Sequence, residues 1–309
     1  MLKKPQQIEP KKTSAILIYG QPGIGKTTLA LSAKNPVLLD FDGGISRTNP
    51  MHRCDTDQLE NGWSDVVADL QAIRGNYNTL IVDNMEKLID MIEQHLKSNG
   101  AKLRKDGSLT MQGYGQRKDI FKQFKNSVYA LGMNLVIVAH QIEEKNEETG
   151  VKNIRPALGK LGDTILGEMD VICYMSLVGS ERTLTFGGDD RLYTKNTIGA
   201  PNRMAVPVLN AGDDNYLLAK LQDIYTETQN EKAAADAKYT ELCSKYDDMV
   251  AKAENADDLN GLVGFFAECE HVYDSKVRAK KQLMERARVI GAKWDKEANG
   301  FVNTNKEGE

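Results

Sequence analysis

A glycine-rich segment of eight residues constrains this chain more than any other feature. Residues 20–27 read G-Q-P-G-I-G-K-T and match the phosphate-binding loop pattern G-x-x-x-x-G-K-[ST] at every fixed position. The apolar run Ala15–Tyr19 comes directly before this segment, and the helix-forming stretch Thr28–Ala33 comes directly after it. A strand, a glycine-rich loop and a helix in this order direct several backbone N–H groups at one point, which phosphate oxygens can occupy. The segment therefore predicts a nucleotide-binding α/β fold.

The side chains at the end of the loop extend this prediction to a metal ion. We expect Lys26 to reach the outer phosphates of a bound nucleotide as a point charge, and Thr27 to hold Mg²⁺ through its hydroxyl. The helix that follows adds partial positive charge beneath the phosphates. The residues expected to bind the nucleotide are Gly20, Gln21, Pro22, Gly23, Ile24, Gly25, Lys26, Thr27 and Thr28.

An acidic residue stands at the end of another apolar run. The run Thr79–Val82 leads directly into Asp83. Hydrolysis at a phosphate loop needs a carboxylate in the shell of the metal, and Asp83 is our candidate for that role beside Thr27. An acid at a strand end can also serve as a turn or cap residue, and that alternative stays open at this point.

Two further runs end in polar side chains. The run Pro36–Leu39 is followed by Asp40 and Asp42, which share one side of the chain because side chains alternate along a strand. Asp42 is nearer the carboxyl edge of the sheet, where ligands of open α/β sheets bind, so it is our candidate for orienting the attacking water. Acids that merely solvate a turn are the alternative. The run Leu135–Ala139 leads into Gln141, which we expect to sense the γ-phosphate.

Length and composition set wider limits. A chain of 309 residues with 40% hydrophobic residues can form one sizeable α/β domain and an accessory region. No stretch approaches the roughly 18 apolar residues that span a bilayer, so we expect a cytoplasmic protein with no membrane partner. The net charge of -4 argues against wholesale coating of nucleic acid, although a local basic patch remains compatible with it. The four cysteines form no C-x-x-C pair, which argues against structural zinc and disulfides.

The pattern of apolar residues divides the chain. From residue 15 to about 220, short apolar runs alternate with polar or amphipathic stretches, which is typical of β-α-β units around a mostly parallel sheet. Beyond residue 222, apolar residues recur every three or four positions and predict helices, one beginning near Asn255 and one running from about Asp274 to Ile290. The expected organisation is an N-terminal arm (1–13), an α/β core (14–221) and an α-helical C-terminal region (222–309).

The loop, the acidic strand ends and the strand that ends in glutamine, in this order, resemble the RecA-like recombinase core. The likeness is to the short phage RecA-like ATPases of the AAA_24 type, which accompany single-strand annealing systems, and it covers about residues 14–207. Within it, Y-T-K-N-T-I-G-A-P (193–201) looks like the RecA segment whose lysines reach the ATP of the neighbouring subunit. Arg191 and Arg203 flank this segment and are candidates for contacts across the subunit boundary, with surface ion pairs as the alternative.

The resemblance implies ATP and Mg²⁺ as ligands, self-assembly into a filament or ring, and roles for single residues. Lys195 stands at the position of the first trans-acting lysine, whereas Thr197 replaces the second. Asp42 stands at the catalytic acid position of the family, where RecA itself has Glu. Gln141 occupies the nucleotide-sensing position.

A basic stretch between the third and fourth apolar runs is the candidate DNA contact. It carries six basic residues against one acid, Asp106, and four glycines, which favours a mobile loop along a phosphate backbone. A solvated surface insertion is the alternative. The basic residues are Lys97, Lys102, Arg104, Lys105, Arg117 and Lys118.

Together these observations predict a RecA-like P-loop ATPase that hydrolyses ATP on single-stranded DNA in phage homologous recombination or annealing. The rival interpretations are a nucleotide-gated binding protein with little turnover and a P-loop kinase. A single-strand-binding or annealing protein is a candidate partner of the C-terminal region. The residues expected to act in hydrolysis are Lys26, Asp42, Asp83, Gln141 and Lys195.

Overall fold

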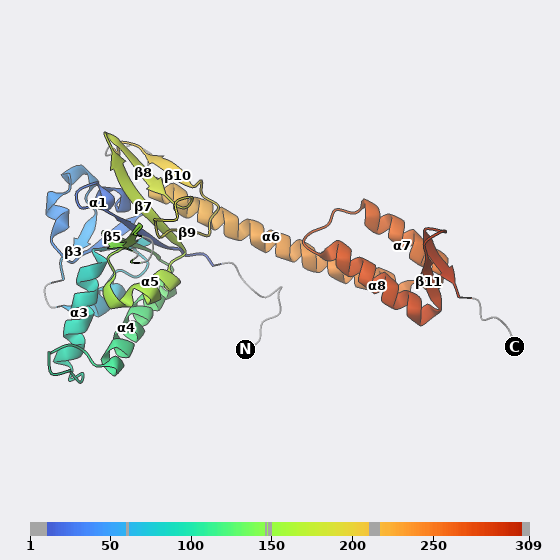
Figure 1. The fold of residues 1–309 in the computed structure, drawn as a ribbon, viewed down its shortest axis with the longest axis horizontal. Helices are drawn as coiled ribbons and strands as arrows, with labels where there is room; N and C mark the ends of the chain where they lie inside the picture. Colours follow the sequence, from blue (N-terminus) through green and yellow to red (C-terminus); the bar gives the residue numbers. More distant parts are fainter. Residues whose placement is uncertain (1–10, 60–61, 146, 148–149, 210–216, 305–309) are drawn as a thin grey trace. The chain divides into compact units, whose positions relative to one another are not determined.

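A computed structural model describes residues 11–59, 62–145, 147, 150–209 and 217–304 (Figure 1). The chain divides into two compact units, Lys11–Thr228 and a C-terminal unit that begins at Gln229. The boundary expected near residue 222 lies inside helix α6 (Leu217–Lys252), which contributes residues to both units. The expected N-terminal arm lies almost wholly outside the described residues.

One sheet organises the first unit, and its strands follow the order β10-β8-β7-β1-β5-β4-β2-β3. The neighbours from β7 to β3 in this order are all parallel, so their carboxyl ends meet at one edge of the sheet. Five of these six strands coincide with apolar runs of the sequence, because strands buried on both faces are apolar throughout. The parallel strands are β1 (Ala15–Gly20), β2 (Pro36–Asp40), β3 (Asp55–Asp57), β4 (Thr79–Asp83), β5 (Asn134–Lys145) and β7 (Val171–Val178).

Antiparallel strands extend the sheet beyond the runs that the sequence predicted. They are short and carry many polar residues, which removes the apolar signal that reveals a buried strand. The segment 193–201, which resembles the lysine-bearing segment of RecA, contributes only the short strand β9, which pairs with β7. These strands are β6 (Lys152–Pro156), β8 (Glu181–Thr185), β9 (Lys195–Asn196) and β10 (Arg203–Val206).

Helices cover both faces of the sheet (Figure 1). One face packs against α2 (Trp63–Ala72), α3 (Met85–Ser98), α4 (Met111–Ala130) and α5 (Gly162–Glu168). The other face packs against α1 (Lys26–Ala30) and the first turns of α6. Successive strand residues alternate between the two hydrophobic cores. Short 3-10 helices complete this unit, namely η2 (Gly44–Arg47), η3 (Pro50–His52) and η4 (Gly159–Leu161).

The C-terminal unit combines helices with a small hairpin. The rest of α6 packs with α7 (Ala256–Glu268) and α8 (Ser275–Ile290), and together they enclose a hydrophobic core that belongs to this unit. The side chain of Asn255 accepts a hydrogen bond from the Asp258 amide and caps α7, as the sequence predicts. After α8, the strands β11 (Ala292–Asp295) and β12 (Gly300–Asn303) form an antiparallel hairpin that the sequence did not predict.

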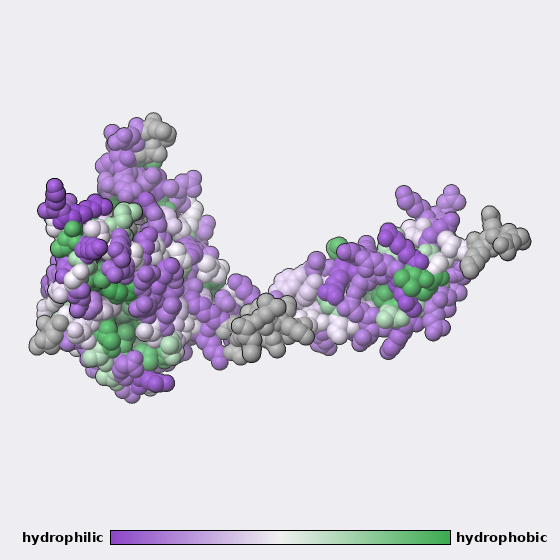
Figure 2. Space-filling view, turned by 90° about the horizontal axis from the view of Figure 1, so that it is seen from below, coloured by the Kyte–Doolittle hydropathy of each residue, from purple (hydrophilic) through white to green (hydrophobic). Residues whose placement is uncertain are grey.

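The predicted fold class is confirmed, since an α/β core with a mostly parallel central sheet is followed by a helical C-terminal region. The face drawn in Figure 2 is largely hydrophilic, with small hydrophobic patches on both units. Among the described residues, the structure contains no helix that is both long and apolar enough to cross a membrane.

Candidate active site

The glycine-rich loop joins β1 to α1 at the carboxyl edge of the sheet. Gly20 ends β1, and a Cβ atom added there would lie 2.3 Å from the carbonyl oxygen of Met175, so only glycine fits. Gly23 and Gly25 have φ angles of 76° and 99°, in the left-handed region that glycine tolerates best. The loop conformation therefore depends on three glycines, of which Gly20 and Gly25 are fixed positions of the sequence pattern.

Lys26 is the first residue of α1, and its side chain reaches back to the beginning of the loop. Its Nζ donates hydrogen bonds to the carbonyl oxygens of Gly20 at 3.0 Å and Gln21 at 2.6 Å, and the residue is 5% exposed. Burial lowers the pKa of Lys26, and the negative charge of Asp83 partly opposes this effect. A buried ammonium held by neutral carbonyls has few compensating charges, so a phosphate group is a favourable partner for it.

Thr27 and Asp83 meet as the sequence predicts. The hydroxyl of Thr27 donates a hydrogen bond of 2.5 Å to Oδ2 of Asp83, which joins α1 to the end of β4. Burial raises the pKa of Asp83, the hydrogen bond from Thr27 lowers it, and the charges of Asp42 and Asp40 raise it further. The structure therefore places a buried carboxylate and a hydroxyl together beside the loop.

These two side chains fit a magnesium ion that also binds phosphate. Mg²⁺ prefers oxygen ligands and usually takes one or two from the protein, with the rest from phosphate and water. The Thr27 hydroxyl and the Asp83 carboxylate supply two such oxygens. No group of three or more His, Cys, Asp or Glu side chains in the described part of the chain could hold a metal by itself. A bound Mg²⁺ would neutralise charge on the phosphates here.

Replacing Asp83 with asparagine is expected to stabilise the nucleotide-free protein at pH values above the folded-state pKa of Asp83. The pKa of the Asp83 carboxyl is higher in the folded chain than in the unfolded chain. The free energy of unfolding therefore falls as the pH rises from the unfolded-state pKa to the folded-state pKa, and it stays at this lower level at higher pH. The uncharged amide of asparagine avoids this loss of stability. We expect a gain of roughly 1 kcal/mol in the free energy of unfolding, which should raise the melting temperature by about 2–4 °C and make it vary less with pH. Thermal unfolding followed by circular dichroism between pH 5 and pH 9 measures both effects. The exposed carboxyl of Asp90 on α3 is the control position, and a destabilised Asp83→Asn protein at high pH would contradict this account.

Asp40 and Asp42 have different surroundings although the chain brings both to the same edge. Asp40 is buried, and its two carboxylate oxygens accept hydrogen bonds from the backbone amides of Gly44 at 2.9 Å and Ile45 at 3.0 Å. Asp42 keeps its side chain 27% exposed and lies 3.5 Å from Arg47. Asp40 therefore fixes the turn after β2, whereas Asp42 retains an accessible carboxylate.

Gln141 lies inside a strand and not beyond its end. The expected run continues as far as Lys145 because β5 forms a hairpin with β6. Oε1 of Gln141 accepts a hydrogen bond of 3.0 Å from the hydroxyl of Tyr174, which lies on β7, on the other side of β1. By strand alternation Gln141 shares its face with Ala139, away from α1. A contact from Gln141 to a phosphate in the loop would therefore require this hydrogen bond to open.

Two residues near the loop are not among the site residues that the sequence predicted. The Nε of Arg182 on β8 donates a hydrogen bond of 2.8 Å to the carbonyl of Ile24 within the loop. His140 pairs in register with Gly20, and its buried Nδ1 has no hydrogen-bond partner among the described residues. Strand pairing brings Arg182 to the loop from far along the sequence, so no local pattern marks it, whereas His140 directly precedes Gln141 after an apolar run. The unpaired nitrogen of His140 is a candidate donor or acceptor for a bound nucleotide.

The candidates for action between subunits make contacts within their own chain. Nζ of Lys195 donates a hydrogen bond of 2.5 Å to the carbonyl of Met169, just after α5. Arg191 forms two hydrogen bonds with the Asp189 carboxylate. Arg203 is exposed and forms no ion pair within the described ranges.

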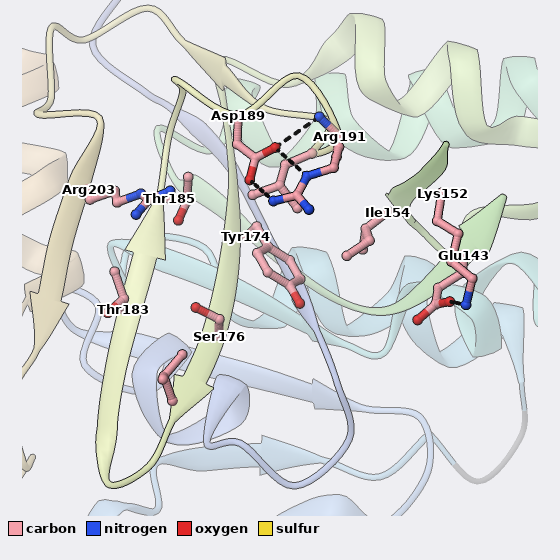
Figure 3. A pocket seen from close by; sticks show the side chains of 12 residues that line it. Glu143, Lys152, Ile154, Tyr174, Ser176, Thr183, Thr185, Asp189, Arg191 and Arg203 are labelled. Carbon is pink, nitrogen blue, oxygen red and sulfur yellow. Dashed lines mark hydrogen bonds and ion pairs between the residues drawn. The ribbon is translucent and has the colours of Figure 1, made fainter. Parts of the chain in front are cut away.

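Arg191 and Arg203 line one cavity of about 500 Å³ over β7, β8 and β10 (Figure 3). Figure 3 shows Tyr174 beside this cavity, with the Glu143–Lys152 ion pair at the β5–β6 hairpin. The strand pairs that form its floor present hydroxyl groups to the same side. The cavity therefore adjoins the Tyr174 hydroxyl that holds Gln141.

The basic stretch is a loop over part of its length. The interpretation as one mobile loop is wrong at both ends, because α3 continues to Ser98 and α4 begins at Met111. Arg117 is 4% exposed on α4 and donates a hydrogen bond of 2.7 Å to Glu93 of α3, so it joins the two helices. Lys97 pairs with the same carboxyl group at 3.0 Å. The exposed basic residues of the remaining turn are Lys102, Arg104 and Lys105.

Comparison with known families decides among the classes of protein that share this loop. The AAA_24 family, described as an AAA domain, matches residues 12–198. The chain belongs to this family. The predicted resemblance to AAA_24 is therefore confirmed over the strands and helices that form the site, and this AAA_24 protein contains a P-loop ATPase domain.

Solved structures show a weaker likeness to this AAA_24 protein. A RadB recombinase has 15% sequence identity and a TM-score of 0.33, covering 57% of this chain and 80% of that one. A prototypical ATPase from the type III secretion system of pathogenic bacteria has 12% identity and a TM-score of 0.36, covering 53% of this chain and 51% of that one. Similarity at this level assigns neither a substrate nor a partner. Among curated proteins, none matches this sequence.

Proposed function

We propose that this AAA_24 protein binds ATP with Mg²⁺ at residues Gly20–Thr28 and hydrolyses it. The observation that carries the proposal is the hydrogen bond between Thr27 and Asp83 directly beside the buried ammonium of Lys26. In this proposal, these two oxygens bind the metal ion and the ammonium binds phosphate at the carboxyl edge of one sheet, where ligands of such sheets bind. Asp42 is the proposed base or orienting group for the attacking water, because its carboxylate remains accessible.

The finer part of the proposal concerns DNA and assembly. We infer that the ATPase acts on single-stranded DNA in phage recombination or annealing, and that it assembles into a filament or ring. The three exposed basic residues of the turn between α3 and α4 support a phosphate-backbone contact. Lys195 reaches the nucleotide of a neighbouring subunit in this proposal, which requires it to leave the carbonyl of Met169.

Phosphate release measured against protein concentration tests the proposal. The rate should require Mg²⁺, rise when a single-stranded oligonucleotide is added, and rise per subunit as concentration increases, because the site is completed between subunits. A rate that ignores every nucleic acid would contradict the DNA part. Tight ATP binding without turnover would favour a nucleotide-gated binding protein, in which the Asp42 carboxylate stays held by Arg47 and the Gly44 amide.

Neutralising Lys102, Arg104 and Lys105 together to alanine is expected to weaken single-stranded DNA binding and its salt dependence. Loss of three phosphate contacts should reduce the slope of log K against log salt by about 2. Fluorescence anisotropy of a labelled oligonucleotide at several salt concentrations measures this slope.

The control for this variant replaces three exposed lysines elsewhere on the same unit. Alanine at Lys12, Lys34 and Lys220 removes the same formal charge and should leave the slope nearly unchanged. Equal slopes for the loop variant and the native chain would remove this turn from the DNA-binding surface.

A further inference from the structure

An open apolar groove lies in the C-terminal unit, outside every site described above. It has a volume of about 470 Å³ and is lined by residues of α7, α8 and both strands of the β11–β12 hairpin. Its lining is apolar except for two lysines. The apolar side chains that define it are Val263, Phe266, Leu283, Met284, Trp294 and Phe301.

The floor of this groove is fixed while its walls stay accessible. Leu283 and Phe301 are each 3% exposed and belong to the hydrophobic core of the unit. Trp294 packs edge-on against Phe301 with ring centroids 5.1 Å apart, and it is half-buried. Met284 is 44% exposed. A fixed aromatic floor with a flexible methionine at its edge is typical of surfaces that bind apolar side chains of a partner.

Two lysines give the groove a charge. Lys276 and Lys280 are exposed and lie one turn apart on α8, where two like charges repel each other. Neither forms an ion pair within the part of the chain that the structure describes, whereas two other basic residues of the same helix, Arg278 and Lys281, pair with acids. The positive charges at the groove are therefore uncompensated, and carboxylates of a ligand would relieve their repulsion.

We propose that this groove binds an acidic peptide segment of a partner protein. One or two large apolar side chains of the peptide enter between Met284 and Trp294, and its carboxylates pair with Lys276 and Lys280. A phosphate backbone would satisfy the lysines and leave the apolar lining exposed, and an uncharged peptide would leave the repulsion between the lysines in place. The combination of an apolar floor and paired cations favours a ligand that is acidic and apolar together.

The fluorescence of Trp294 measures this binding directly, because the side chain lines the groove. The chain has two tryptophans, and replacing Trp63 with phenylalanine leaves Trp294 as the only fluorophore of its kind. A synthetic peptide rich in Asp and Glu with two phenylalanines near one end should change the Trp294 emission in a saturable way. Peptides in which the phenylalanines become serine, or the acids become amides, should bind at least tenfold more weakly.

Charge reversal tests the lysines. Lys276→Glu together with Lys280→Glu should weaken the acidic peptide about tenfold or more, since two attractive charges become repulsive. The matched control is Lys232→Glu with Lys296→Glu, which makes the same change in net charge at exposed positions outside the groove. Equal weakening by both double variants would show a general charge effect and would overturn the proposal.

Met284→Lys separates the apolar contribution from charge. This variant adds a positive charge but blocks the apolar wall, so the proposal expects weaker binding of the acidic peptide. The control is Val289→Lys on the same helix, at a side chain that is 74% exposed and outside the groove. Binding that tightens in Met284→Lys would mean attraction by charge alone and would contradict the groove.

The fluorescence of Trp294 also tests two other ligands for the groove. A Trp294 response to a single-stranded oligonucleotide without a response to the peptide would identify a nucleic-acid site. A response that appears on concentrating the protein alone would identify a second copy of the chain as the ligand. Either result would overturn the proposal. Peptide binding is independent of the ATPase proposal, so a Lys26→Ala chain should bind the peptide with unchanged affinity.

Discussion

Lys26→Ala is expected to abolish ATP hydrolysis, with a loss of about 10²–10³-fold in turnover, comparable to removing one preorganised charge-stabilising donor from an active site. Lys26 is the buried cation whose Nζ reaches back to the loop, and alanine removes the positive charge from the position where phosphate charge is expected to collect. Phosphate release under saturating Mg²⁺ and ATP measures the loss, and calorimetry measures the accompanying fall in ATP affinity.

A nearby lysine provides the control for this variant. Lys34 is 59% exposed and pairs with Asp223, away from the loop. Lys34→Ala changes the net charge equally and should keep full turnover. The Lys26→Ala chain should also keep its circular dichroism spectrum, because alanine is a good helix former at the start of α1. Retention of more than about a tenth of the native rate would remove Lys26 from the phosphate-binding role.

Asp42→Asn is expected to lose turnover while keeping its affinity for ATP. A positioned carboxylate that accepts a proton from water contributes about 10²–10⁴-fold to the rate, whereas an amide cannot act as the base. Because Asp42 lies beyond the end of β2 and bonds to the Gly44 amide rather than to the loop, its replacement should leave phosphate binding intact. Single-turnover hydrolysis and calorimetric titration with ATP separate the two effects.

Asp40→Asn is the matched comparison, because the structure gives this acid another role. Its carboxylate accepts hydrogen bonds from two backbone amides in the turn after β2, so the amide side chain should cost about 1–3 kcal/mol of folding free energy. Thermal unfolding should detect that loss, with turnover reduced much less than in Asp42→Asn. Native turnover in Asp42→Asn, or the larger kinetic loss in Asp40→Asn, would reverse the assignment of the two acids.

The core strands of the fold could be predicted because burial on both faces leaves a continuous apolar run in the sequence. The helices of the C-terminal region could be predicted from their three-to-four residue period, and Asn255 marks the start of α7 through its cap. The strands β6, β8, β9 and β10 could not, because short strands with many polar residues have no such pattern. The prediction of a mobile loop for the basic stretch was wrong for a related reason. The glycines of this stretch suggested a loop, whereas α4 begins at Met111 and includes two of them.

The candidate site shows the same division. Lys26, Thr27 and Asp83 could be assigned from sequence, because the loop pattern and a strand-end acid are both local signals. The sequence favoured Asp42 over Asp40 by its position nearer the carboxyl edge, and the hydrogen bonds of the folded chain show that Asp40 is tied to the turn whereas Asp42 stays accessible. Arg182 reaches the loop through strand pairing across the sheet, a contact between residues that are distant in sequence.

The sequence by itself determined the chemistry of the phosphate loop, because its glycines and its lysine act through backbone geometry and charge at adjacent positions. The tertiary structure alone decided which acid stays accessible, which arginine is buried between helices, and that Gln141 is held by Tyr174. Burial and hydrogen bonding depend on residues that the fold brings together from distant parts of the chain. A local pattern contains no information about such neighbours.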